Sequence, residues 1–146
     1  MKIALDTNFL ISLVSEAAAN HALTLTCYQQ LQQDGAECII AEHALLEAFS
    51  VLSRAPKPLA MPPRDAERVL AETFRQATLA PFHRGLAWNA IRHTLERNKW
   101  GGRVYDTAIA LAVFDAGARL LLTWDVEDMR SIAPEGLEVR APDTYS

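Results

Sequence analysis

The chain has 146 residues, of which 50% are hydrophobic and 22% are charged, and its formal net charge is −4. These values are ordinary for a globular protein, so we expect a single domain over residues 1–146. No apolar run is long enough for a membrane span, and the first residues do not resemble a signal peptide. Two cysteines without a Cys-x-x-Cys pair argue against a disulfide framework, a zinc site or a redox site, so we expect a cytoplasmic protein with structural thiols.

Short apolar runs alternate with helical patterns along the chain. Prolines at four positions between residues 55 and 63 mark a connecting loop, because proline interrupts helices and central strands. Strands that alternate with helices indicate an α/β fold with a largely parallel sheet. The patterns predict helices over about residues 8–15, 21–33, 42–54, 64–77, 84–97 and 104–114, strands over 3–5, 37–41, 120–123 and 137–139, and a short strand or extended link over 78–80.

Two of the predicted helices differ in how their apolar residues are arranged. The helix over residues 104–114 is apolar at nearly every position, which is typical of a helix that is packed on both sides. The helix over residues 84–97 is amphipathic instead. We expect its buried side to consist of Leu86, Ala90, Ile91 and Leu95.

Asp6 directly follows the first predicted strand and precedes Thr7 and Asn8, where a helix is expected to begin. In open α/β sheets, ligands bind at the carboxyl ends of the strands, so Asp6 is a candidate for chemistry. Aspartate is also a preferred N-cap of helices. The residue by itself therefore leaves capping and chemistry equally open.

Other carboxylates follow the same logic to different degrees. Asp125 comes after the strand over residues 120–123, so Asp6 and Asp125 should converge at one edge of a parallel sheet. Asp106 stands alone at the start of its helix and reaches that edge only if the preceding turn brings it there. Glu47 lies off the centre of the apolar stripe of its helix, so helix geometry alone favours a side chain that faces solvent. Asp128 extends the acidic cluster in a predicted loop.

Four carboxylates in one place repel each other strongly. Such a cluster needs a cation to neutralise it, or raised pKa values. Hard divalent cations such as Mg²⁺ or Mn²⁺ match an all-carboxylate site. Ions of this kind can activate water and stabilise a leaving oxygen in phosphodiester hydrolysis.

Positive charge is concentrated in one segment, residues 83–103, although the whole chain is acidic. Five Lys or Arg side chains there stand against one Glu, which gives the segment a net charge of +4. Such a stretch can track a phosphate backbone or form an ordinary solvated helix face. Trp88, Trp100 and Trp124 can stack on nucleobases where they are exposed, and a core or interface position is equally open for each. The basic residues are Arg84, Arg92, Arg97, Lys99 and Arg103.

Four sequence blocks, in their order and spacing, resemble the PIN-domain family. They are residues 5–8, residues 44–52 around Glu47, residues 102–109 around Asp106, and residues 121–125. The block Gly-Arg-Val-Tyr-Asp at 102–106 most resembles the VapC toxins of prokaryotic VapBC toxin–antitoxin systems. The resemblance covers essentially the whole chain.

This resemblance implies a three-layer α/β/α PIN-like fold with a mainly parallel sheet, and an endoribonuclease that depends on Mg²⁺ or Mn²⁺. The resemblance makes Asp6 and Asp106 the core metal ligands. Glu47 completes the acidic site, and Asp125 is a fourth carboxylate, held directly or through water. These four residues are the catalytic and metal-binding candidates.

The resemblance also implies supporting residues and partners. Asn8 and Thr123 resemble polar residues that orient the carboxylates, and Asp128 matches a position that is often acidic and peripheral. Family members usually form homodimers and are silenced by a VapB antitoxin whose tail enters the active site. We expect the basic segment to hold the RNA backbone near the acidic cluster through Arg97, Lys99 and Arg103.

Two alternatives belong to other functional classes. A HAD-like phosphatase also places an Asp after its first strand, but its motif has a second Asp two residues later, where this chain has Asn8. The second alternative is a catalytically silent PIN domain that binds RNA or a protein partner. All four acidic positions are filled here, which counts against loss of catalysis.

Overall fold

Five parallel strands form the centre of the protein in the computed structural model, which describes residues 1–145. The strands are β1 (Lys2–Leu5), β2 (Glu37–Ala41), β3 (Thr78–Ala80), β4 (Leu120–Leu122) and β5 (Glu138–Arg140). Their order in the sheet is β3-β2-β1-β4-β5, and every neighbouring pair is parallel. The helices are α1 (Thr7–Val14), α2 (His21–Gln33), α3 (Glu42–Arg54), α4 (Pro63–Thr73), α5 (Leu86–Glu96), α6 (Arg103–Asp115) and α7 (Val126–Arg130), and a 3₁₀ turn, η1 (Pro142–Thr144), follows β5.

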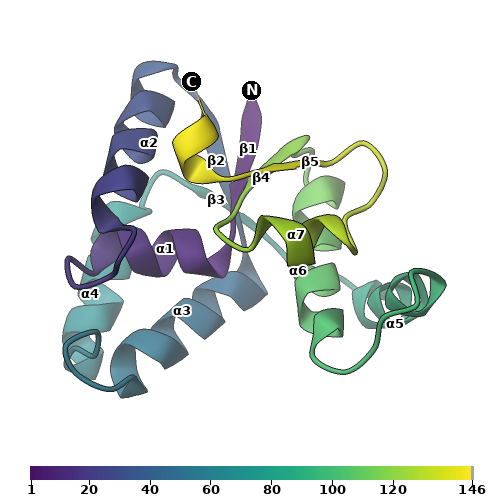
Figure 1. Ribbon diagram of the computed structural model, residues 1–146, viewed down its shortest axis with the longest axis horizontal. Helices are drawn as coiled ribbons and strands as arrows, with labels where there is room; N and C mark the ends of the chain where they lie inside the picture. The colour runs from purple at the N-terminus through teal and green to yellow at the C-terminus, as the bar shows by residue number, and fades with distance from the viewer. Residues whose placement is uncertain (146) are drawn as a thin grey trace.

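Helices flank the sheet on both sides (Figure 1). α1, α2, α3 and α4 pack against one another on one side, while α6 lies against β2 and β3 on the other and carries α5 on its outer face. The expectation of an α/β fold with helical layers around a parallel sheet is therefore confirmed. None of the helices in residues 1–145 has the length and hydropathy needed to cross a membrane.

The direction of winding changes at β1, which lies between β2 and β4. The chain runs outward from β1 through β2 to β3, and then returns to add β4 on the opposite side of β1. The backbone N–H of Asp6 continues the β1–β4 pairing by donating to the carbonyl of Leu122 at 3.1 Å. Such a switch point is where open α/β sheets form a crevice at the carboxyl ends of their strands.

The central strands are aliphatic because both of their faces are covered. Ile3, Ala4 and Leu5 of β1 and Leu121 of β4 have no exposed surface. The neighbouring helix α6 contributes Ile109, Ala110, Ala112 and Val113 to the same core cluster as the strands. This dense packing fixes the strand ends from which two of the candidate carboxylates project.

The buried side of α5 differs from the expected one. Leu86 and Ala90 are buried, but Ile91 and Leu95 are 44% and 59% exposed, and Thr94 is buried in their place. Thr94 is accommodated because its hydroxyl bonds to the carbonyl of Ala90 and to the hydroxyl of Thr107 on α6. The amphipathic pattern gave no sign that a polar pair would hold these two helices together.

Two other boundaries differ from the sequence predictions. α4 ends at Thr73 rather than near residue 77, and the chain then turns directly into β3, which settles the choice left open for residues 78–80 in favour of a strand. The predicted acidic loop after Asp125 contains the short helix α7. Five residues are too few for a helical period to be visible in the sequence.

Replacing Leu121 with alanine should destabilise the protein by about 2–5 kcal/mol, because the truncation leaves a cavity in a fully buried strand. Leu46→Ala is the matched control, since Leu46 is 68% exposed on α3, and its effect should stay within about 0.5 kcal/mol. Urea denaturation of the two variants measures both values. Equal losses of stability would contradict the assignment of β4 to the core.

Candidate active site

Asp6 occupies the junction between β1 and α1, where it serves as the N-cap of the helix. Its Oδ1 accepts a hydrogen bond from the backbone N–H of Thr7 at 2.8 Å, and its Oδ2 accepts one from the hydroxyl of Thr123 at 2.8 Å. The residue is only 5% exposed. Asp6 therefore both caps α1 and lies at the carboxyl end of β1. Its second oxygen, which takes no part in capping, faces Thr123, the residue directly after β4.

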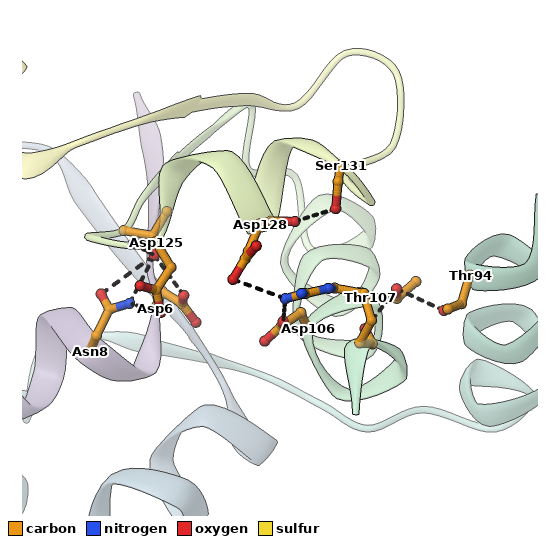
Figure 2. Close-up of polar contacts among 10 residues, drawn as sticks. Asp6, Asn8, Thr94, Asp106, Thr107, Asp125, Asp128 and Ser131 are labelled. Carbon is orange, nitrogen blue, oxygen red and sulfur yellow. Dashed lines mark hydrogen bonds and ion pairs between the residues drawn. The ribbon is translucent and has the colours of Figure 1, made fainter. Parts of the chain in front are cut away.

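Asn8 and Thr123 join the ends of the two central strands through hydrogen bonds, and Figure 2 shows Asn8 beside Asp6 and Asp125. The side-chain amide of Asn8 donates to Thr123 Oγ1 at 3.0 Å and to Asp125 Oδ2 at 3.2 Å, while its carbonyl accepts from the backbone N–H of Trp124. The Thr123 oxygen also accepts from the backbone N–H of Asp125. Asp6, Asn8, Thr123 and Asp125 thus form one hydrogen-bonded group, as the convergence of parallel strands predicts.

Asp106 lies in the first turn of α6, and an arginine links it to Asp128 on α7. Arg103 Nη1 is 3.1 Å from Asp106 Oδ2 and 3.2 Å from Asp128 Oδ2. In Figure 2 Asp106 and Asp128 lie to one side of the group that contains Asp6. The structure therefore presents the acidic side chains as two neighbouring groups.

Glu47 comes from α3 and approaches the first group from another direction. Its Oε1 accepts a hydrogen bond from the hydroxyl of Thr7 at 3.3 Å and lies 3.5 Å from Nε2 of His43, one helical turn earlier. The side chain is 42% exposed, so it is open to solvent, as helix geometry alone predicts, and it also faces the residue next to Asp6. Helix periodicity could not show this because the contact depends on how α3 packs against α1.

The carboxylates influence one another's ionisation. Burial raises the pKa of Asp6 from 3.8 to about 6, against the lowering effect of its hydrogen bonds from Thr123 and Thr7, and the charges of Asp106 and Glu47 add to the rise. Burial also raises the pKa of Asp106, although the guanidinium of Arg103 opposes it. The charges of Asp6, Glu47 and Asp106 are thus close enough to be coupled.

The donor set suits a hard divalent cation, since Asp6, Glu47, Asp106 and Asp125 offer carboxylate oxygens only. Within residues 1–145, however, no three acidic, histidine or cysteine side chains stand close enough to hold one metal ion together. Mutual repulsion keeps like charges apart, and Arg103 neutralises part of the cluster from within the chain. The set fits Mg²⁺ or Mn²⁺ in its chemistry, and a bound ion would have to draw the carboxylates together.

The three basic residues singled out in the sequence occupy different places. Lys99 and Arg103, together with the 76%-exposed Trp100, line a surface groove that Asp106 also lines. Arg97 instead donates a hydrogen bond to the carbonyl of Ala133 at 3.1 Å, which ties α5 to the loop before β5. Lys99 and Arg103 are therefore placed beside the acidic cluster, whereas Arg97 is engaged in a structural contact.

His43 and Tyr105 are neighbours of the site to which the sequence analysis gave no role. Their rings are stacked, with centroids 5.5 Å apart and planes inclined by 5°. His43 stands four residues before Glu47, and Tyr105 directly precedes Asp106. The spacing of four residues could have indicated that His43 lies near the site, because it places His43 on the same helix face as Glu47. The contact between α3 and α6 could not be predicted from the sequence.

Comparisons with known proteins identify the relatives of the chain. No protein-family model matches it. It is 31% identical over 118 residues to Ribonuclease VapC27 of Mycobacterium tuberculosis (strain ATCC 25618 / H37Rv), an alignment that covers 81% of each protein. The fold is similar to a chain of VapBC2 from Rickettsia felis bound to a DNA fragment from their promoter, with a TM-score of 0.69, 16% identity, and 97% and 98% of the two chains covered. It is also similar to Mycobacterium tuberculosis VapC20, a sarcin-ricin loop cleaving toxin, with a TM-score of 0.68, 18% identity, and 91% and 97% covered.

The fold and these relatives define a PIN-domain protein. More narrowly, the chain belongs to the VapC family. The resemblance found in the sequence is confirmed at both levels.

The raised pKa of Asp6 predicts how stability depends on pH in metal-free protein. A carboxyl group whose pKa is about 6 when folded and near 3.8 when unfolded stabilises the fold below about pH 4, and that contribution is lost as pH rises through 6. The shift corresponds to about 3 kcal/mol. The free energy of unfolding of the wild type, relative to that of Asp6→Asn, should therefore fall by about this amount between pH 4 and 7.

Urea denaturation in EDTA across this pH range gives the comparison. Asp65→Asn, which changes an exposed carboxylate on α4, is the control and should follow the wild-type profile. Parallel profiles for the wild type and Asp6→Asn would show that the Asp6 carboxylate is not desolvated in solution.

Proposed function

We propose that this protein is a divalent-metal-dependent endoribonuclease that acts as the toxin of a type II toxin–antitoxin pair. The observation that carries the proposal is the gathering of carboxylates at the carboxyl edge of the sheet, where Asp6 and Asp125 share the hydrogen bonds of Asn8 and Thr123 and Glu47 is hydrogen-bonded to Thr7. Membership of the VapC family supports RNA as the substrate, because the relative from Mycobacterium tuberculosis is named a ribonuclease.

Asp6, Glu47, Asp106 and Asp125 would hold Mg²⁺ or Mn²⁺. The chemistry gained with such an ion bound is polarisation of the phosphodiester and activation of water for its hydrolysis. Asn8 and Thr123 orient the carboxylates of Asp6 and Asp125 through the hydrogen bonds between the strand ends. We assign Asp128 a peripheral role, in which it shares the charge of Arg103 with Asp106.

The residues around the carboxylates restrain the carboxylate side chains and do not themselves react. Asp6 cannot rotate freely, because both of its oxygens accept hydrogen bonds from neighbouring residues. Asp106 is paired with Arg103 in the first turn of α6. The residue after it, Thr107, is buried. Each of these two side chains is therefore already restrained before a cation binds, and the remaining rearrangement is the approach of the two acidic groups to each other.

The partners follow from the same family relation. The solved relatives include VapBC complexes from Rickettsia felis and Salmonella typhimurium, which supports a VapB-like antitoxin as the protein partner of this chain. We further propose that the protein is a homodimer and that it is located in the cytoplasm. Each chain would consist of a single domain. A catalytically silent PIN domain and a HAD-like phosphatase are the competing functions, and the cleavage experiment below separates them from a nuclease.

The purified protein should cut total cellular RNA into discrete fragments with Mg²⁺ or Mn²⁺ and leave it intact in EDTA. Asp6→Ala and Asp106→Asn should each slow cleavage by about 10²–10⁴-fold, because each removes a carboxylate on which several kcal/mol of transition-state stabilisation depend. Asp65→Asn, a carboxylate change on α4, should cleave like the wild type.

Electrophoresis of the RNA after a time course measures the rates. A folded protein that binds metal but leaves every RNA intact would favour the silent PIN domain. A phosphoenzyme formed with a phosphate donor would favour the phosphatase. Cleavage that persists in EDTA or in Asp6→Ala would remove the metal centre from the mechanism.

Lys99 lies exposed in the groove that Asp106 also lines, so we expect it to contact a phosphate of bound RNA. Lys99→Gln should weaken binding of single-stranded RNA and lower the slope of log K against log salt by about 0.7. Arg92→Gln removes an exposed charge from α5 outside this groove and is the control. Fluorescence-anisotropy titrations from about 50 to 200 mM salt give the slopes. Equal slopes for both variants would exclude a specific contact by Lys99.

A further inference from the structure

Three aromatic rings gather beside the acidic cluster and are not used by the proposed function. His43 of α3 stacks on Tyr105 of α6, and its ring also lies 6.5 Å from that of Phe82, in the loop after β3. We refer to His43, Phe82 and Tyr105 as the aromatic ledge. Its members come from three elements that are far apart in the sequence, so the fold itself brings them together.

The ledge borders two of the four candidate carboxylates. His43 Nε2 lies 3.5 Å from Oε1 of Glu47, and Tyr105 is the residue directly before Asp106. Consecutive residues of an α-helix project about 100° apart, so Tyr105 and Asp106 occupy adjoining sectors of the first turn of α6. The ring of Tyr105 therefore lies next to Asp106 on the side where α6 meets His43 of α3.

The outer rings of the ledge are unusually open to water. Tyr105 is 56% exposed although one side of its ring is covered by His43, and Phe82 is 48% exposed. Rings that served only to pack α3 against α6 would gain more by being buried, since removal of apolar surface from water is favourable. The stacked geometry instead leaves a flat ring available on the surface.

The groove lined by Lys99, Trp100 and Arg103 also has Asp106 in its wall. Basic side chains beside an exposed aromatic ring are the combination that binds single-stranded nucleic acid, because phosphates meet the cations and bases stack on the rings. The ledge adds a second stacking surface next to the same carboxylate. A nucleotide chain that crosses Asp106 can therefore meet rings both in the groove and on the ledge.

We propose that the aromatic ledge is a nucleobase-binding subsite, in which one unpaired base of the RNA stacks on the outer face of Tyr105. The adjacent phosphodiester then lies over Glu47 and Asp106. This inference rests on the proposed function and names its substrate class, which is RNA that is unpaired at the cleavage site. Bases in a duplex are already stacked on their neighbours and cannot splay onto a protein ring.

The test measures RNA binding by the full chain in EDTA, which prevents metal-dependent cleavage. The probes are a single-stranded RNA that contains 2-aminopurine and the duplex of the same sequence. The variants are Tyr105→Leu, which keeps the apolar bulk but removes the ring, and Tyr105→Phe, which keeps the ring. Trp88→Leu is the control for an exposed aromatic residue outside the ledge and the groove, on α5.

Tyr105→Leu should bind the single strand about 5- to 150-fold more weakly than the wild type, which is the range expected for one base–aromatic stack. Tyr105→Phe and Trp88→Leu should bind like the wild type. The wild type should quench 2-aminopurine fluorescence, and Tyr105→Leu should not. Duplex binding should be weaker than single-strand binding and unaffected by Tyr105→Leu.

Thermal denaturation checks that Tyr105→Leu is folded. If it is not, Tyr105→Trp serves instead, since its larger ring should tighten single-strand binding and keep the quenching. The proposal is overturned if Tyr105→Leu binds RNA as tightly as the wild type, or if it loses as much affinity for the duplex as for the single strand. It is also overturned if the wild type binds no RNA, or if Tyr105→Leu changes the oligomeric state of the protein and not its RNA affinity.

Cleavage with Mg²⁺ is measured separately on the same proteins, so that the two proposals can fail independently. A wild type that cleaves RNA while Tyr105→Leu retains full affinity keeps the nuclease and removes the ledge. A wild type that binds as expected but never cleaves keeps the ledge and removes the nuclease.

Discussion

The carboxylate of Asp6 is buried where the two central strands of the sheet end, and the rest of the site depends on this. Its burial is tolerated because the Thr123 hydroxyl and the Thr7 amide each donate to one of its oxygens. These bonds offset the desolvation only in part, since the pKa of the group still stands at about 6. The protein therefore keeps an unfavourable charge at the switch point of its sheet, and functional sites are where proteins retain such local costs.

The remaining acids are arranged around that fixed point by different means. Asp125 is joined to it through Asn8 and Thr123, Glu47 reaches it through Thr7, and Asp106 is paired with Arg103. The proposed metal site places two opposing demands on this arrangement. The carboxylates would have to come close enough to share a cation, yet without one they repel each other, and the arginine reduces that repulsion.

The position of a residue could be predicted from the sequence where it follows from the strand or helix to which the residue belongs. Asp6 and Asp125 follow directly from parallel strands, because strand ends share one edge. Glu47 was placed near the site by family resemblance, whereas the period of its own helix gave no reason to place it there. The sequence did not predict the burial of Thr94 or the stacking of His43 on Tyr105, because each depends on the packing of two helices. The periodicity of one helix does not show which other helix packs against it.

The topology also has a consequence for synthesis of the protein on the ribosome. Asp6 follows the first strand, β1, but the hydroxyl that holds it belongs to Thr123, which follows β4 and is made 117 residues later. A nascent chain that stops anywhere before β4 has no Thr123 and no Asp125, so Asp6 lacks its donor and the acidic group lacks a member. The site therefore cannot form until the chain has been made as far as Asp125, and translation products that stop before β4 cannot contain it.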